Sequence, residues 1–145
     1  MARVEIILDV ISAEETVEWY TRVLGWKGSY DVFDKDNNCL FGEVYTLTPL
    51  SEESQSHIGF NLARSDPSTN SGYGSSWQAL IYVDDVEAIY RRVLENGWSI
   101  LAGLENQPWG GRTFKMVDLN GVRLTFAQMI ESPSIEEIQS RIDSH

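Results

Sequence analysis

The chain has little of what disulfides, thiolate metal sites and nucleic-acid surfaces require. Its 145 residues include a single cysteine, Cys39, which excludes an internal disulfide and a cysteine-rich zinc site. Lysine and arginine total 11 against 22 aspartates and glutamates, so the formal net charge is −11. A surface of this sign repels phosphate backbones and anionic lipids. We therefore expect neither nucleic acid nor a membrane among the partners of this chain.

Long apolar runs and export features are also missing. The most apolar stretches, such as residues 4–10, are interrupted by charges well short of the ~20 residues that a membrane-spanning helix needs. The N-terminal residues show no basic segment followed by an apolar run and a small-residue cleavage site. These features predict a cytoplasmic protein in which Cys39 is a small apolar strand residue.

The composition is that of a folded domain, and the sequence contains an internal repeat. Hydrophobic residues make up 42% of the chain, which is typical of a globular protein. Residues 20–24 (YTRVL) are matched by residues 90–94 (YRRVL), and the Gly25-Trp26 pair is matched by Gly97-Trp98. Each copy lies in an amphipathic helical pattern that ends at glycine.

Strand patterns flank both helices. Capping patterns place the start of the first helix at Ser12 with Glu15, and the start of the second at Asp84 with Glu87. A further capping box in residues 134–137 begins a short amphipathic tail helix, which we expect to pack on the body or on a second subunit. Alternation of apolar and polar residues predicts strands at residues 3–10, 26–33, 39–47, 57–63, 77–83, 98–104, 112–118 and 122–128.

These elements predict an α+β fold made of two tandem βαβββ modules. The first module covers residues 1–64 and the second covers residues 77–129. Residues 65–76, which are rich in Ser, Asn, Asp, Pro and Gly, form the linker. Residues 130–145 form the C-terminal helical tail, and the whole chain is expected to be one structural domain.

Three further segments carry a family resemblance: residues 82–86 (YVDDV), 107–114 (QPWGGRTF) and 118–124 (DLNGVRL). With the duplicated modules, they resemble the vicinal oxygen chelate superfamily, which includes glyoxalase I, extradiol dioxygenases, fosfomycin-resistance enzymes and bleomycin-resistance proteins. The resemblance covers residues 3–128 and implies a curved, barrel-like mixed sheet with a cleft. Within the superfamily the chain is most similar to the bleomycin-resistance branch, which is poor in metal ligands.

The resemblance also implies where a divalent metal would bind, because enzymes of the superfamily hold one between strands of both modules. The corresponding positions here are Glu5, Gln78 and Thr125, with a fourth near Gly59 or Asn61. Glu5 is a sound ligand and Gln78 an acceptable one, whereas Thr125 is a poor substitute for a carboxylate. His57 and Glu43 are further donors, although nothing in their spacing demands such a role.

We therefore expect no metal cofactor and no catalytic residue; if a metal does bind, Glu5 and Gln78 are its predicted ligands. What remains is a cleft, because strand alternation leaves aromatic, aliphatic and a few polar side chains on one face. Trp109 offers a face for stacking, and Arg112 is either a ligand contact or the partner of a carboxylate. The predicted ligand-binding residues, which would otherwise be core or dimer-interface residues, are Glu5, Phe41, Tyr45, Gln78, Tyr82, Trp109, Arg112, Phe114, Met116 and Thr125.

The predicted function is binding of a small molecule by a homodimer. By its resemblance to the bleomycin-resistance branch, and because of its net charge, the chain would sequester a cationic or aromatic compound, such as an antibiotic, without metal chemistry. One alternative is a metal-dependent glyoxalase-type lyase or isomerase, or a dioxygenase, with an atypical ligand set. A non-catalytic structural or regulatory module is the other.

Overall fold

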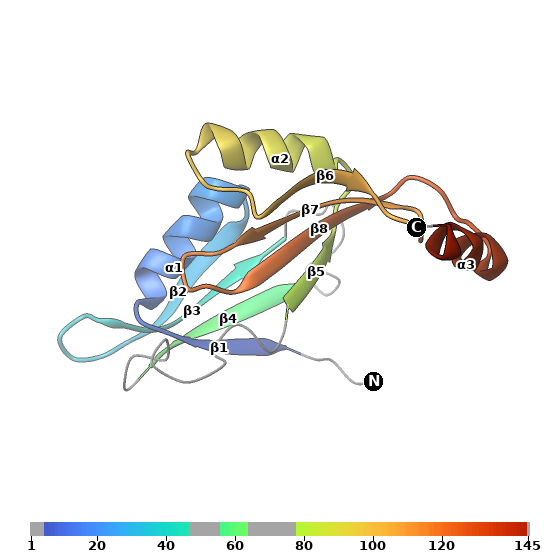
Figure 1. The fold of residues 1–145 in the computed structure, drawn as a ribbon. Helices are drawn as coiled ribbons and strands as arrows, with labels where there is room; N and C mark the ends of the chain where they lie inside the picture. Colours follow the sequence, from blue (N-terminus) through green and yellow to red (C-terminus); the bar gives the residue numbers. More distant parts are fainter. Residues whose placement is uncertain (1–4, 47–55, 64–77, 145) are drawn as a thin grey trace. The chain divides into compact units, whose positions relative to one another are not determined.

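The computed structural model describes residues 5–46, 56–63 and 78–144, which belong to two compact units, Met1–Tyr73 and Gly74–His145 (Figure 1). The predicted linker and the first residues of the first predicted strand lie outside the described residues. Each unit contains one βαβββ module, and the second ends in an additional short helix. The α+β class with two tandem modules is therefore confirmed. In the described residues the strands form two four-stranded sheets, one in each module, and they do not close into a barrel.

The first module has a mixed sheet in the order β1-β4-β3-β2. β1 runs parallel to β4, and the other neighbours are antiparallel. The predicted cap is confirmed, since the Ser12 side chain accepts a hydrogen bond from the Glu15 amide at 3.2 Å. The elements are β1 (Ile6–Val10), α1 (Ala13–Trp19), the π-helix η1 (Tyr20–Leu24), β2 (Lys27–Phe33), β3 (Cys39–Tyr45) and β4 (His57–Leu62).

One face of this sheet packs against α1. Val17 of the helix fills the space above Gly28 and Gly42, neither of which has room for a side chain. Val44 and Phe60, from the same face of the sheet, are fully buried. Because side chains alternate along a strand, Glu43 and Gly59 lie on the opposite face. That second face carries the polar residues Glu43 and His57.

The second module repeats the topology, with the strand order β5-β8-β7-β6. Its helix begins one residue later than predicted, because Asp85 rather than Asp84 is the N-cap and accepts a hydrogen bond from the Ala88 amide at 3.0 Å. The Gln128 side chain on β8 also accepts from the first helical amide, that of Val86, at 3.0 Å. The elements are β5 (Gln78–Tyr82), α2 (Val86–Glu95), β6 (Ala102–Asn106), β7 (Gly111–Val117), β8 (Arg123–Met129) and α3 (Ile135–Asp143).

The core of the second module is aromatic and lies between α2 and the sheet. The rings of Phe114 and Phe126 stack at a centroid distance of 5.0 Å, and Tyr90 of α2 meets Phe114 edge-on at 5.3 Å. Both phenylalanines are fully buried. This packing determines which face of β7 and β8 is available to a ligand.

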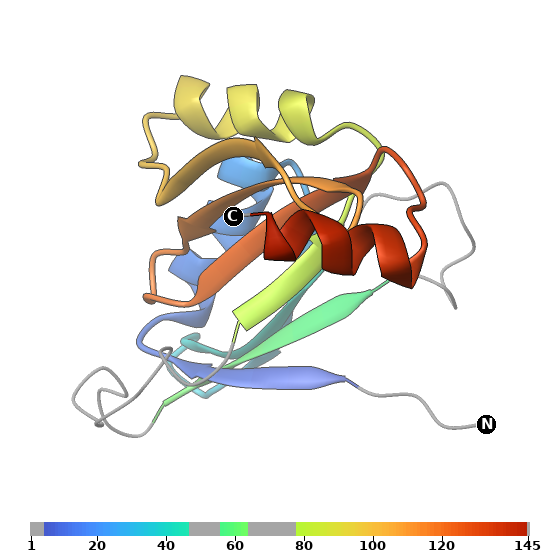
Figure 2. The same ribbon diagram turned by 45° about the vertical axis from the view of Figure 1, so that its right-hand side comes forward.

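The predicted tail helix is present as α3 (Figure 2). Arg141 anchors it by donating to the Pro108 carbonyl at 3.1 Å and by pairing with Glu131. α3 buries none of its residues within this chain, and Ile135 is 81% exposed. None of the described helices is long and apolar enough to cross a membrane.

Candidate functional site

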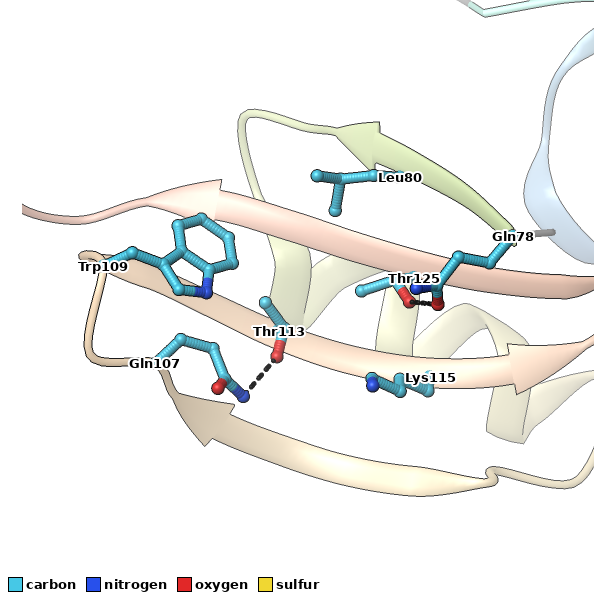
Figure 3. A pocket seen from close by; sticks show the side chains of 7 residues that line it. All are labelled: Gln78, Leu80, Gln107, Trp109, Thr113, Lys115 and Thr125. Atoms are coloured by element: carbon cyan, nitrogen blue, oxygen red, sulfur yellow. Dashed lines mark hydrogen bonds between the residues drawn. The ribbon is translucent and has the colours of Figure 1, made fainter. Parts of the chain in front are cut away.

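A cavity of about 270 Å³ lies on the face of the second sheet that α2 does not cover (Figure 3). Trp109 and Gln107 stand at one end of it, and Gln78 and Lys115 lie toward the other. The side chains that line it are Gln78, Leu80, Gln107, Trp109, Thr113, Lys115 and Thr125.

The strand register brings these side chains to one face. Lys115 on β7 is opposite Thr125 on β8, and Thr125 is in turn opposite Leu80 on β5. Directly paired residues project to the same face of a sheet. Thr113, two positions before Lys115, therefore shares this face, while Phe114 projects to the other.

The two glutamines of the cavity are each paired with a threonine. The Gln107 side-chain amide donates to the Thr113 hydroxyl at 2.9 Å, and the Thr125 hydroxyl donates to the Gln78 amide oxygen at 3.3 Å (Figure 3). These bonds orient both glutamines before a ligand arrives. Lys115 is the charged residue in the described lining, so the cavity is locally cationic. The Lys115 ammonium and the Gln78 amide supply hydrogen-bond donors.

The turn between β6 and β7 positions Trp109. The Gly110 amide donates to the Gln107 carbonyl at 3.0 Å, and the Gln107 amide donates to the Gly111 carbonyl at 2.7 Å. Gly110 has a φ of +100°, and a side chain there would strike the Glu131 backbone. A side chain at Gly111 would strike the Trp109 ring. The two glycines thus allow the half-buried indole to lie close over Gly111 at one end of the cavity.

Three predicted ligand-binding residues of β7 lie on the wrong face of the sheet. Arg112 pairs with Glu87 of α2 at 3.2 Å and donates to Asn106 at 2.8 Å, which matches the alternative prediction of a carboxylate partner. Phe114 and Met116 are fully buried in the core beneath α2. The physical reason is the register, which pairs Phe114 with Phe126 and Met116 with Leu124, two fully buried residues.

The predicted ligand-binding set left out four residues that line the cavity, Leu80, Gln107, Thr113 and Lys115. Thr125, a predicted ligand-binding residue, lines the cavity, and residues opposite it on a hairpin partner share its face. Counting back across the Asn-Gly turn from Thr125 would have led to Lys115 and Thr113. Tyr82, also predicted, shares the face of Leu80 but is 61% exposed and does not line the cavity.

The remaining predicted residues, Glu5, Phe41 and Tyr45, belong to the first module. Glu5 lies there in a second polar group, together with Glu43 and His57. One donor atom each from Glu5, Glu43 and His57 lies within 4.8 Å of the others. Tyr45 packs edge-on against the His57 ring at a centroid distance of 5.0 Å, and Phe41 covers Gly59. Burial raises the pKa of Glu43, and the hydrogen bond and negative charge of the adjacent Glu5 raise it further.

The chain belongs to the Glyoxalase/Bleomycin resistance protein/Dioxygenase superfamily, whose sequence model matches residues 4–126. Among solved structures, it is similar to a glyoxalase-related enzyme from Clostridium phytofermentans, with 20% identity and a TM-score of 0.70 over 90% of this chain and 96% of that one. TioX from Micromonospora sp. ML1 shares 17% identity, with a TM-score of 0.67 over 89% and 99% of the two chains. A bleomycin resistance determinant encoded on the transposon Tn5 shares 19%, with a TM-score of 0.62 over 88% and 98%. At these identities the likeness shows the fold, and no curated protein matches the chain.

The metal positions implied by the superfamily do not suit a divalent cation in the second module. Gln78 and Thr125 offer an amide and a hydroxyl, and they are hydrogen-bonded to each other. The described lining of the cavity includes no carboxylate, imidazole or thiolate, which are the donors that hold divalent transition metals. In the first module, the side-chain amide of Asn61, another implied metal position, donates to Asp9 at 3.4 Å. Glu5 lies instead near two further metal donors, Glu43 and His57. We therefore derive no metal-dependent step at the cavity.

Proposed function

We propose that the cavity of the second module binds a planar aromatic small molecule and sequesters it without changing it chemically. The observation that carries this proposal is the half-buried Trp109 ring at the mouth of a cavity whose glutamines are oriented in advance. An aromatic ligand would stack on the indole at a small entropic cost, because the ring and its turn are already held in place.

The charge of the cavity favours the aromatic ligand over the cationic one that the sequence also suggested. A cation in the cavity would be repelled by the Lys115 ammonium at short range, whereas the net charge of −11 acts over the whole surface and is screened by salt. A carboxylate or carbonyl on the ligand would accept hydrogen bonds from Lys115 and from the Gln78 amide. The ligand class we propose is therefore an aromatic compound with an acceptor group, and aromatic antibiotics of this kind are included.

The size of the cavity supports a ligand of one or two rings, or the ring portion of a larger molecule. An engineered apolar cavity of about 150 Å³ in another protein holds benzene, and this cavity is about 270 Å³. Sequestration is favoured over catalysis because the hydroxyls of Thr113 and Thr125 are paired with amides rather than with a general base.

The proposal is tested by titrating the protein with an aromatic carboxylate and with its neutral amide, following tryptophan fluorescence and calorimetry. We expect saturable binding that weakens about tenfold or more in Trp109→Ala, since truncating an aromatic anchor costs about 2 kcal/mol. Lys115→Ala should weaken the carboxylate but leave the amide nearly unchanged. Lys27→Ala, on the exposed β2, is the matched control. Equal affinity of wild type and Trp109→Ala, or no saturable binding across a panel of such compounds, would contradict the proposal.

A metal-dependent enzyme of glyoxalase type is the second candidate. The observation in its favour is the group formed by Glu5, Glu43 and His57 in the first module, which has the donor types of a divalent metal site. Retention of a metal by this group would justify assays for lyase, isomerase and dioxygenase activity.

We also propose that the chain works as a homodimer in the cytoplasm. Support for self-association comes from exposed apolar side chains, including Ile6 and Ile7 on the edge strand β1 and Ile135 on α3.

A further inference from the structure

The first module gathers two carboxylates and an imidazole from three adjacent strands. β4 lies between β1 and β3, and His57 is its first residue. Glu43 on β3 is opposite Gly59, two positions along β4 from His57, so it projects to the same face as His57. Glu5 directly precedes β1, whose Ile6 is opposite Ile58. The sheet order therefore places His57 between Glu5 and Glu43, with one donor atom of each within 4.8 Å of the others.

Among the residues that the structure describes, none satisfies the ring nitrogens of His57. The side chain is 17% exposed, and both ring nitrogens are buried without a hydrogen bond to any residue that the structure describes. The Glu43 carboxylate is 3.7 Å from Nδ1, which is too long for a hydrogen bond. Buried polar atoms without partners are rare in proteins, and a ligand to the ring would satisfy one of these.

In the described part of the chain, the two carboxylates also lack a partner with a permanent positive charge. Among the described residues, no lysine or arginine forms an ion pair with Glu5 or Glu43. Burial raises the pKa of Glu43, and the adjacent Glu5 raises it further, because two carboxylates that share a site oppose each other's ionisation. A bound cation would offset the negative charge of both carboxylates.

The spacing of the donors is close to that of a metal site. Donors bound to zinc at about 2.1 Å are separated by about 3.4 Å when the site is tetrahedral. The 3.7 Å between His57 Nδ1 and Glu43 Oε2 is near this value. Small side-chain rotations would therefore bring these two atoms to the separation found in a metal site. Imidazole in the donor set favours Zn²⁺, Fe²⁺ or Ni²⁺ over Mg²⁺ and Ca²⁺, which prefer oxygen alone.

We propose that Glu5, Glu43 and His57 form a binding site for a divalent transition metal within the first module. Three protein ligands leave the metal a position open to water or a small ligand. Glu5 is the one residue of this set that the family resemblance also implied, and the other two donors come from the same sheet rather than from the second module. The three ligands all come from the first module, and none of them lines the cavity of the second, so the proposal does not depend on the proposed sequestration.

The test is zinc binding by metal-free protein, measured by competition with a chromophoric chelator and by metal content after desalting. We expect about one zinc per chain, and an affinity that falls about tenfold or more in Glu43→Gln and His57→Gln, since even supporting residues of metal sites contribute 10–100-fold. Glu136→Gln on the exposed first turn of α3 and His145→Gln, which removes the other histidine, are the matched controls. Cys39→Ser excludes the thiol as the zinc ligand. Absence of retained zinc, or equal affinity in wild type and both site variants, would overturn the proposal.

A second measurement on the wild type keeps the test independent of how the variants fold. Nitrogen-15 spectra resolve the ring nitrogens of the two histidines, and zinc should shift those of His57 and leave those of His145 unchanged. Cobalt bound at the same site should show visible ligand-field bands that disappear when zinc is added in excess. Unshifted His57 ring nitrogens at saturating zinc would overturn the proposal even if the protein retained metal elsewhere.

Discussion

At the scale of single residues, glycine at two positions decides where the aromatic face of the cavity lies. Gly110 adopts a φ that L side chains rarely adopt, and the space above Gly111 is filled by the Trp109 ring. Neither glycine is among the described residues that line the cavity. Both are needed because a side chain at either position would displace the turn or the indole.

Gly111→Ala should therefore impair ligand binding as well as stability. The added methyl group meets the Trp109 ring, which has to move, and overpacking of this kind costs about 1–3 kcal/mol. Urea denaturation measures the stability, and the fluorescence titration measures the affinity. Gly103→Ala on β6 is the control, because a methyl group there meets nothing within 4 Å. Equal stability of the two variants would show that Trp109 is not held against Gly111.

At the scale of elements, the two serine-capped helices differ in what they bury. α1 and α3 each begin with a serine whose side chain accepts a hydrogen bond from a backbone amide, at 3.2 Å in one and 3.1 Å in the other. α1 contributes Val17 to the core, whereas α3 buries no residue. The same capping chemistry should therefore have different consequences for the stability of the module.

Ser12→Ala should lower the free energy of unfolding by about 0.5–2 kcal/mol, the usual cost of losing an N-cap. Ser134→Ala should fray α3 and leave the unfolding midpoint nearly unchanged, because the core of the second module does not depend on that helix. Denaturant unfolding gives the first quantity, and hydrogen exchange of α3 amides gives the fraying. If Ser134→Ala lowered global stability as much as Ser12→Ala, α3 would have to be packed against something, such as a second subunit.

At the scale of the whole molecule, each module has its own sheet, helix and candidate site. The described residues that line the cavity belong to the second module, and the three ligands of the proposed metal site belong to the first. Loss of one site therefore need not impair the other. Lys115→Ala should leave zinc binding unchanged, and Glu43→Gln should leave binding of the aromatic carboxylate unchanged.

The proposed dimer is a prediction at this same scale. Sedimentation velocity at micromolar concentration should show a species of twice the 16.4 kDa chain mass. Ile135→Ser and Ile142→Ser on α3, combined in one chain, should weaken the association if that helix is part of the interface, because both side chains are exposed in the single chain. A 16.4 kDa species alone, at every concentration tested, would contradict the dimer.

The sequence by itself was enough to predict the βαβββ modules and most strand positions, because periodicity and capping are local properties of the chain. The strand predicted at residues 98–104 instead begins at Ala102, although the equivalent strand in the first module begins directly after Trp26. The Trp98 indole donates to the Val117 carbonyl at 2.6 Å, and this long-range bond holds the chain between α2 and β6 in an irregular path. A repeat in sequence does not encode such a bond.

Only the tertiary structure decided which side chains meet. Alternation shows that Phe114 and Lys115 face opposite ways, but the register with β8 and the covering helix α2 determine which of them reaches the cavity. Glu5, Glu43 and His57 are distant in the chain, and the strand order β1-β4-β3 brings them together. Local patterns specify elements because their causes act within a few residues, whereas a site depends on pairings between strands that no local pattern specifies.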